Sequence, residues 1–225
     1  MNEKRQNIII AIDGPAGAGK STIAKQLARC LGISYLDTGA MYRALTLKAL
    51  RESIPLENED ELVALAQRSS IDLRGDVKAG LKVFLDGEDV SEEIRSLEVT
   101  NHTFYIARTK GVREIMAEWQ RSIGQKKDIV AEGRDIGTVV FPHATNKFYL
   151  DADFEERAKR RILELKEKGK DVDAEKLSAD LKERDTKDFT RKVAPLKKAD
   201  DAVVIDSTHL SIDEVVEKIL EHIKK

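Results

Sequence analysis

The sequence is poor in cysteine, proline and aromatic residues, and it contains no long hydrophobic run. Cys30 is the one cysteine among 225 residues, which excludes an internal disulfide framework and a multi-cysteine zinc site. So little cysteine is typical of proteins that fold in a reducing compartment. We therefore expect a cytoplasmic protein.

Apolar runs are short throughout the chain. Near the amino terminus the uninterrupted apolar run extends only from Ile8 to Ile12 before Asp13 ends it, which is too short for the core of a signal peptide. No later segment has the roughly 20 apolar residues that a membrane-spanning helix requires. We therefore expect no membrane partner.

Neither sign of charge dominates. The chain has 39 lysines and arginines against 41 aspartates and glutamates, a formal net charge of -2. This balance argues against a uniformly basic surface for nucleic acid, and aromatic residues, at 5%, leave little for stacking on single strands. We expect no nucleic-acid partner, so any phosphate-binding power must come from local clusters of arginine and lysine.

Short apolar runs alternate with helical patterns. The run from Ile8 to Ile12 precedes a glycine-rich turn and predicts a strand buried on both faces. Apolar spacing then predicts a helix over 20–31, ended by Gly32. Further short runs, each followed closely by an acidic residue, occur at 34–36, 129–131, 148–150 and 202–205. The pattern favours an α/β fold, a doubly wound parallel sheet of about five strands, closed by a helix from Ser211 with a capping box.

Two stretches do not follow this alternation. Residues 71–90 combine short strand-like runs with glycine-containing turns, which predicts a small antiparallel insert. The segment 154–198 is densely charged and helical, and on charge alone it is typical of a solvated surface. It carries Arg157, Arg160, Arg161, Arg184 and Arg191.

The strongest signal lies between the first strand and the first helix. Residues 14–21 fit the pattern GxxxxGK[ST] in the strand-loop-helix context that a phosphate-binding loop (P-loop) requires. Lys20 is expected to reach the β- and γ-phosphates, and the Ser21 hydroxyl to bind Mg²⁺. The residues expected to bind ATP are Gly14, Pro15, Ala16, Gly17, Ala18, Gly19, Lys20, Ser21 and Thr22.

A P-loop identifies a nucleoside triphosphate but not a reaction. A GTPase would need NKxD, and the nearest string, 146–149, has Tyr149 where the aspartate is required. A DxxG string at 72–75 falls in the predicted insert. A motor or translocase would usually be larger, with aromatic or basic surfaces for a strand. A small-molecule kinase requires instead a second anion site and an arginine-rich cover.

Several further motifs, most of which contain arginine, occur along the chain. They are LDTGAMYR at 36–43, LDGEDVSEEIR at 85–95, EGRDIGTVVFP at 132–142, LDADFEERAKRR at 150–161, KERDTKDFTRKVAPL at 182–196 and VVIDST at 203–208. With the P-loop, and in this order, they resemble the bacterial cytidylate kinase family over essentially the whole chain. The resemblance implies ATP-dependent phosphorylation of CMP and dCMP, with Mg²⁺, under an arginine-rich lid.

The resemblance also implies a division of the single kinase unit 1–225. The core is expected at 1–40, 126–152 and 200–225, and the monophosphate-binding region, which contains the antiparallel insert, at 41–125. A short helical lid is expected at 153–199. Monomer is the expected state, because no exposed apolar stripe stands out in the sequence.

Site residues follow from the resemblance, residue by residue. Those implied to hold the phosphate side of the acceptor are Thr38, Arg43, Arg134 and Arg191. Arg113 and Asp135 are implied to read the cytosine, and Arg184 and Asp188 to contact the ribose. An aspartate suits this role, because its carboxylate accepts a hydrogen bond from the exocyclic amino group, whereas uracil would present a carbonyl.

The wider monophosphate kinase superfamily implies two lid roles. Arg157 is expected over the adenine and Arg161 at the phosphates, and the two lie four residues apart on one helical face. The catalytic group is therefore expected to comprise Lys20, Arg134, Arg157, Arg161 and Arg191. The chain departs from the family after Asn101, where a serine that touches the base is often found and Thr103 or Phe104 stands near its place.

Two alternatives remain open from the sequence. One is a P-loop kinase for another small acceptor, such as UMP, dTMP or a non-nucleotide alcohol, from which Arg113 and Asp135 would distinguish this chain. The other is a nucleotide-dependent module without turnover. The ratio of CMP to dCMP use and the preference for ATP over GTP are not encoded in any motif.

Overall fold

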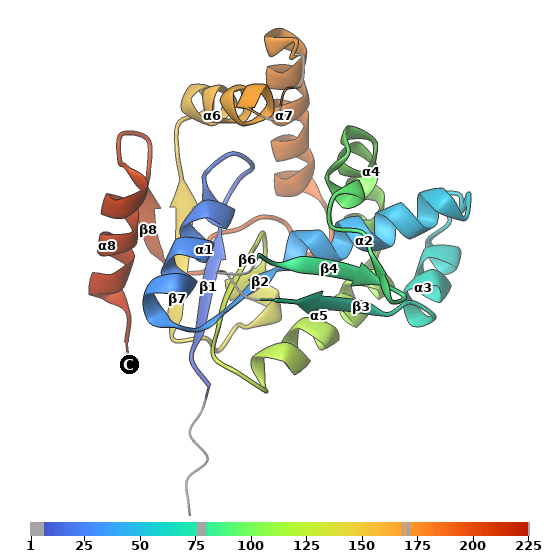
Figure 1. The fold of residues 1–225 in the computed structure, drawn as a ribbon, viewed down its shortest axis with the longest axis horizontal. Coiled ribbons are helices and arrows are strands. Elements are labelled where there is room, and N and C mark those ends of the chain that lie inside the picture. Colours follow the sequence, from blue (N-terminus) through green and yellow to red (C-terminus); the bar gives the residue numbers. More distant parts are fainter. Residues whose placement is uncertain (1–6, 76–79, 168, 170–171, 225) are drawn as a thin grey trace, which may run out of the picture. The chain divides into compact units, whose positions relative to one another are not determined.

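The structure is a computed structural model that describes residues 7–75, 80–167, 169 and 172–224 (Figure 1). The chain forms two compact units, one comprising residues 1–9 and 28–131 and the other residues 10–27 and 132–225. The boundary passes through the strands β1 (Ile9–Asp13) and β6 (Ile129–Gly133) and through the helix α1 (Lys20–Leu31), most of which belongs to the second unit. The three-part division inferred from the sequence stays a prediction.

A five-stranded parallel sheet confirms the predicted fold class. Its strand order is β2-β6-β1-β7-β8, where β2 is Ser34–Asp37, β7 is Asn146–Asp151 and β8 is Val203–Asp206. β7 pairs in parallel with both β1 and β8. Because the carboxyl ends of parallel strands lie at one edge of the sheet, the strand-terminal aspartates of β1 and β7 share that edge.

The unit of residues 10–27 and 132–225 carries the P-loop and the charged helices. α1 (Lys20–Leu31) follows the loop, and a single π-helical turn, η2 (Ile136–Val140), follows β6. The predicted lid segment holds α6 (Phe154–Glu167) and α7 (Ala174–Thr190), while residues 168, 170 and 171 lie outside the described part. α6 and α7 pack through Ala158, Leu181 and Phe154 onto Ala16 of the P-loop.

The chain closes on a capped helix. α8 (Ile212–His222) lies beside β8 (Figure 1). Ser211 and Glu214 form the predicted capping box, since the Ser211 hydroxyl accepts from the Glu214 N–H and the Glu214 carboxylate accepts from the Ser211 N–H.

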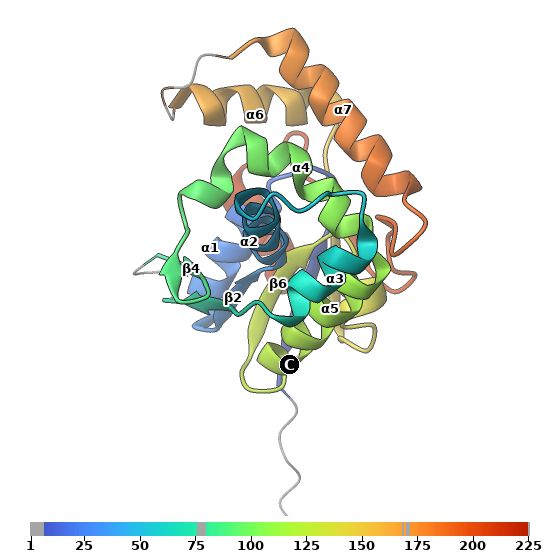
Figure 2. The same cartoon turned by 90° about the vertical axis from the view of Figure 1, so that its right-hand side faces the viewer.

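The unit of residues 1–9 and 28–131 contains the predicted insert. The strands β3 (Ile71–Arg74), β4 (Lys82–Leu85) and β5 (Glu88–Asp89) form an antiparallel sheet in that order, and residues 76–79 of the insert lie outside the described part. The helices of this unit are α2 (Thr38–Arg51), α3 (Glu59–Gln67), η1 (Glu93–Arg95), α4 (Leu97–Arg108) and α5 (Lys110–Gly124). Figure 2 shows α2 nearly end-on, with α4 crossing it and packed against it.

The insert is held by its own apolar core. Val83 and Leu85 of β4 pack with Ala40, Ala44 and Leu47 of α2, and all five side chains are buried. The antiparallel sheet therefore covers one face of the helix that begins at Thr38. Within the described ranges, no helix is both long enough and apolar enough to cross a membrane.

Candidate active site

The P-loop is shaped by two glycines that no other residue could replace. Gly14 has φ +153°, and a Cβ there would lie 2.0 Å from the carbonyl oxygen of Leu150 in β7. Gly17 has φ +78°, and its Cβ would lie 2.9 Å from the carbonyl oxygen of Arg157 in α6. Both positions combine a backbone conformation that favours glycine with a close approach of another segment. The loop is thus fixed against β7 and α6.

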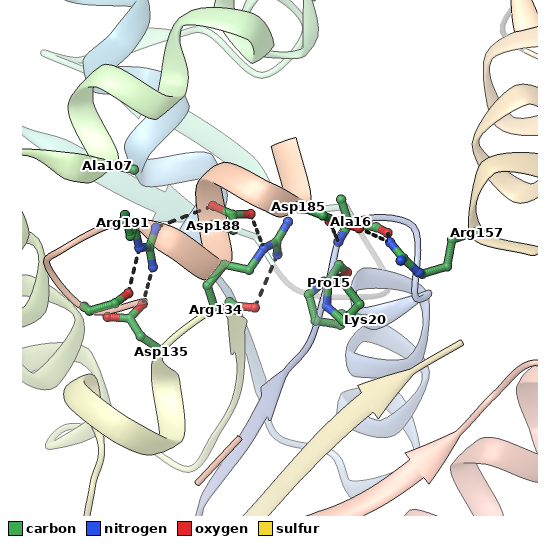
Figure 3. A network of polar contacts seen from close by, with 12 residues as sticks. Pro15, Ala16, Lys20, Ala107, Arg134, Asp135, Arg157, Asp185, Asp188 and Arg191 are labelled. Carbon is green, nitrogen blue, oxygen red and sulfur yellow. Dashed lines mark hydrogen bonds and ion pairs between the residues drawn. The ribbon is translucent and has the colours of Figure 1, made fainter. Parts of the chain in front are cut away.

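Lys20 begins α1 and its side chain turns back into the loop. Its Nζ donates a hydrogen bond to the carbonyl oxygen of Pro15 at 2.6 Å, and the residue is 5% exposed (Figure 3). Burial, followed by the positive charge of Arg134, lowers the pKa of Lys20 to about 7. A bound phosphate would reverse this effect, because an adjacent anion favours the charged ammonium.

Ser21 faces an acidic residue that the sequence analysis did not assign. Its hydroxyl donates a hydrogen bond to the carboxylate of Glu132, at the end of β6. A hydroxyl and a carboxylate are hard oxygen ligands of the kind that Mg²⁺ accepts, together with water and phosphate oxygens. Among the described residues, no group of three or more His, Cys, Asp or Glu side chains is placed to hold a metal ion. The sequence feature that could have identified Glu132 is its position directly after the apolar run 129–131.

Asp13 ties the end of β1 to the start of η2. Its Oδ1 accepts the N–H of Ile136 at 2.8 Å and its Oδ2 accepts the N–H of Gly137 at 2.7 Å. The residue is 4% exposed, and this burial raises the pKa of its carboxyl to about 6 despite the two hydrogen bonds. In the sequence, Asp13 is recognisable only as the residue that ends an apolar run.

The raised pKa of Asp13 predicts a specific dependence of stability on pH. The folded protein holds the proton more tightly than the unfolded chain does, so the contribution of this group to stability is full below pH 3.8 and is lost as the pH rises through about 6. The loss should be on the order of 3 kcal/mol, since each pKa unit corresponds to about 1.4 kcal/mol. In urea unfolding between pH 4 and 7, Asp13→Asn should remove that decline; a wild-type and a variant curve that stay parallel would contradict the assignment.

A largely buried network of arginines and carboxylates lies next to the start of η2 (Figure 3). Arg134 donates from Nε to Asp188 at 2.8 Å. Arg191 lies 3.6 Å from Asp188 and 3.8 Å from Asp135, and its Nε donates to the carbonyl oxygen of Ala194 at 2.7 Å. Burial alone would raise the pKa of Asp188, but Arg134, Arg184 and Arg191 outweigh it and hold that pKa below its usual value. The structure therefore brings together these five predicted residues of the acceptor set.

The two predicted lid arginines are in different surroundings. Arg157 donates from Nε to the carbonyl oxygen of Ala152 and from Nη1 to that of Ala16, each at 2.9 Å, and it pairs with Asp185. Asp185 also accepts the N–H of Ala16 at 3.1 Å. Arg161 is partly exposed and pairs with Glu164 at 2.6 Å.

Arg157 and Asp185 thus fasten α6 and α7 to the P-loop. The placement of Arg157 over the adenine stays a prediction, as does that of Arg161 at the phosphates. Asp185 was not assigned from the sequence. The sequence feature that could have identified Asp185 is its spacing of three residues from Asp188, which places both on one face of the helix. In the structure both side chains are buried.

The remaining predicted residues lie in the other unit. Thr38 is the first residue of α2, directly after Asp37, whose side chain caps the helix by accepting the N–H of Ala40 at 2.8 Å. Arg43, one turn later, pairs with Asp37 at 3.1 Å. Because cap and ion pair share one carboxylate, Asp37 sets the positions of both Thr38 and Arg43.

Arg113 and Thr103 of the same unit lie on α5 and α4. Arg113 is buried, donates from Nη1 to the carbonyl oxygen of Ala107 at 2.9 Å and stands 5.3 Å from the ring of Tyr42. The Thr103 hydroxyl donates to the carbonyl oxygen of Val99 at 2.7 Å, within its own helix. A role for Thr103 or Phe104 at the base stays untested.

Comparison with known proteins places the chain in a family. The sequence model of the Cytidylate kinase family matches residues 10–225. The "Cytidylate kinase" of Caldanaerobacter subterraneus subsp. tengcongensis is 52% identical over 96% of this chain and 94% of the relative. That of Clostridioides difficile is 48% identical over 96% of this chain and 98% of the relative. That of Bacillus licheniformis is also 48% identical, over 98% and 97% respectively.

A solved structure shares the fold. The crystal structure of an uncharacterized protein from Eubacterium ventriosum covers 96% of this chain and 97% of its own, with a TM-score of 0.50 and 15% identity, a likeness that concerns the fold alone. The family model and the curated relatives extend over the P-loop and every acceptor residue discussed above. The chain therefore belongs to the cytidylate kinase family.

Proposed function

We propose that this protein transfers the γ-phosphoryl group of ATP to CMP, with dCMP as a second acceptor. The observation that carries the proposal is a P-loop whose lysine is buried against it, in a chain that matches cytidylate kinases at about half identity over nearly its full length. The same unit also contains the partly buried Arg134 and the buried Arg191, which share Asp188 as a partner.

The donor side is assigned to the P-loop. Its backbone N–H groups and the amino end of α1 would hold the phosphates of ATP, with the Lys20 ammonium against the β- and γ-phosphates. Ser21, with Glu132 beside it, would hold Mg²⁺, which supplies neutralisation of the phosphate charge when bound. Arg157 and Arg161 are proposed to face the adenine and the transferring phosphate once both substrates are bound.

The acceptor side is assigned to the buried network. Arg134 and Arg191 are proposed to hold the phosphate of CMP, Asp135 to accept from the cytosine amino group, and Asp188 with Arg184 to contact the ribose. Arg134 and Arg191 already share Asp188 as a partner, which fixes their guanidinium groups before substrate arrives. Thr38, Arg43 and Arg113 are assigned to CMP by family resemblance alone.

The chemistry requires positioning more than proton transfer. The attacking oxygen belongs to a monophosphate that is already largely ionised near neutral pH, so no strong protein base is needed. Phosphoryl transfer proceeds through a loose transition state in which fixed positive charge supplies most of the acceleration. The arginines and Lys20 would supply that charge.

The exposed apolar side chains bear on the oligomeric state of the protein. The large apolar side chains that are about half exposed lie on separate elements of the described chain, and they include Leu97, Leu163, Phe189, Val204 and Ile212. Scattered apolar residues of this kind are normal on a monomer. We therefore propose that the protein works as a monomer. Its proposed location is the cytoplasm, and its proposed partners are small nucleotides.

A panel of acceptors tests the function. Release of ADP from ATP is measured in a coupled assay with CMP, dCMP, UMP, dTMP or no acceptor, each with and without Mg²⁺. CMP and dCMP should support turnover far better than the other two. ADP release at one rate with every acceptor would indicate hydrolysis, and binding of ATP without release would indicate a module without turnover.

The identity of the base reader is tested by Asp135→Ala. The variant should lose about 30- to 150-fold in kcat/KM for CMP, because one desolvated hydrogen bond to a charged group is worth on the order of 2–3 kcal/mol. UMP should lose much less, since it never makes that bond. Steady-state kinetics with both acceptors decide: an equal proportional loss would mean that Asp135 supports Arg191 and does not read the base.

A further inference from the structure

Asp13 occupies the junction between two functional segments. It is the last residue of β1 and directly precedes Gly14 of the P-loop, while its carboxylate holds the N–H groups of Ile136 and Gly137. Arg134 and Asp135 are the two residues before Ile136. One short, buried side chain therefore connects the start of the donor loop to the segment that carries two proposed acceptor residues.

The contact is built for a carboxylate. η2 has only five residues, and the N–H groups at its start have no acceptors within the turn. The two oxygens of Asp13 accept from two of these donors at 2.8 and 2.7 Å, one oxygen to each N–H, so both carboxylate oxygens are used. The turn therefore takes its position from Asp13.

Gly137 lies between Asp13 and the side chain of Lys147, with little room for a larger residue. A Cβ at that position would lie 3.2 Å from Cδ of Lys147 and 3.4 Å from Oδ2 of Asp13. Lys147 directs its ammonium elsewhere, since Nζ donates to the carbonyl oxygen of Pro142 at 2.6 Å and pairs with Asp201 at 2.9 Å. The methylene groups of Lys147 close the far side of the contact.

The other end of the connection is equally fixed. Gly14 lies against the backbone of Leu150, so the end of β1 cannot shift without disturbing β7. Displacement of η2 is consequently not absorbed by the P-loop, and it would move Arg134 and Asp135 instead. The side chain of Asp13 is the fixed reference for the acceptor segment.

We propose that Asp13 is a positioning residue, which sets the acceptor segment Arg134–Asp135 at a fixed distance from the phosphate-binding loop. The inference rests on the proposed function, because it assumes that this segment binds the nucleoside monophosphate. Asp13 itself touches neither substrate. Its effect is exerted through the backbone of Ile136 and Gly137.

The test is Asp13→Asn, which keeps the size of the side chain but places an NH₂ group against one of the two N–H donors. The variant should lose about 10- to 100-fold in kcat/KM for CMP. This is the range expected when one of the two hydrogen bonds is broken and its buried N–H is left without an acceptor. Affinity for a non-hydrolysable ATP analogue, measured by calorimetry without acceptor, should change less than about threefold. Selectivity for CMP over UMP should fall as well, which a purely structural role would not cause.

Asp128→Asn is the matched control. Asp128 accepts the N–H of Ile8 at 2.7 Å, next to the opposite end of β1, so the same chemical change is made at a similar contact away from the P-loop. This variant should keep wild-type values for both substrates. An Asp13→Asn protein with unchanged kinetics, or with equal losses for CMP and the ATP analogue, would refute the inference.

Gly137→Ala approaches the same contact from the other side and serves if Asp13→Asn does not fold. The added Cβ would lie 3.2 Å from Cδ of Lys147, so either that side chain or η2 must shift slightly. A shift of η2 should reduce kcat/KM for CMP selectively. In the double variant the losses should be less than additive, because both changes break one contact. If neither variant loses CMP use selectively, the inference is refuted but the proposed function is not. If the wild-type protein is inactive with every acceptor, the proposed function itself is refuted.

Discussion

Lys20→Ala is expected to lower kcat by about 10²- to 10³-fold or more, because it removes a fixed positive charge from the phosphate that is transferred. The melting temperature should stay close to that of the wild type. Burial lowers the pKa of Lys20 to about 7, so without nucleotide the charged side chain is a cost to the folded state. Single-turnover kinetics with saturating CMP, together with a thermal melt, measure both quantities.

Lys25→Ala is the control for this prediction. Lys25 lies on the same helix, α1, and is partly exposed. It should turn over at the wild-type rate. A Lys20→Ala protein with an unchanged rate and melting curve would refute the assignment of the P-loop, and one that loses its fold would show that Lys20 is held for structural reasons.

Local pattern was sufficient to predict much of the fold. The apolar run ending at Asp13 and the helical spacing over 20–31 correspond to β1 and to α1 at Lys20–Leu31. The insert was predicted from short strand-like runs with glycine-containing turns over 71–90, and β4 and β5 do pair across one of these turns, Asp86-Gly87. Each of these elements is encoded by residues close together in the sequence.

The contacts that organise the site could not be predicted in this way. Asp13 bonds to Ile136 across 123 residues, and Asp185 bonds to Ala16 across 169. An acidic residue at the end of a strand looks the same whether it faces solvent, a metal or a distant backbone. Only the sheet order, which places β6 beside β1, decides between these.

Arg157 shows the same limit. Its helical position and its spacing from Arg161 could be predicted from the sequence. The contacts of its guanidinium with the carbonyl oxygen of Ala16 and the carboxylate of Asp185 could not. A periodic pattern gives the face of a helix on which a side chain lies. The partner on that face depends on packing between α6, α7 and the P-loop.

Arg191→Ala should have the second large effect, and here activity and stability fall together. Without the guanidinium, Asp135 loses a charge at 3.8 Å and Asp188 one at 3.6 Å, and breaking buried pairs of this kind costs about 3–5 kcal/mol of stability. The value of kcat/KM for CMP should fall about 10²- to 10³-fold, since a charge-assisted contact to the acceptor phosphate is also lost. Affinity for an ATP analogue should change little.

Arg191→Lys separates the two roles. The ammonium keeps the positive charge beside Asp135 and Asp188, so the melting temperature should recover most of what Arg191→Ala loses. It cannot reproduce the planar fork that donates to the carbonyl oxygen of Ala194 and to a phosphate at once, so kcat/KM for CMP should stay low. A lysine variant that restores stability and CMP turnover in equal measure would show that Arg191 acts only by its charge within the network, and the contact to the acceptor phosphate would then have to be assigned to Arg134.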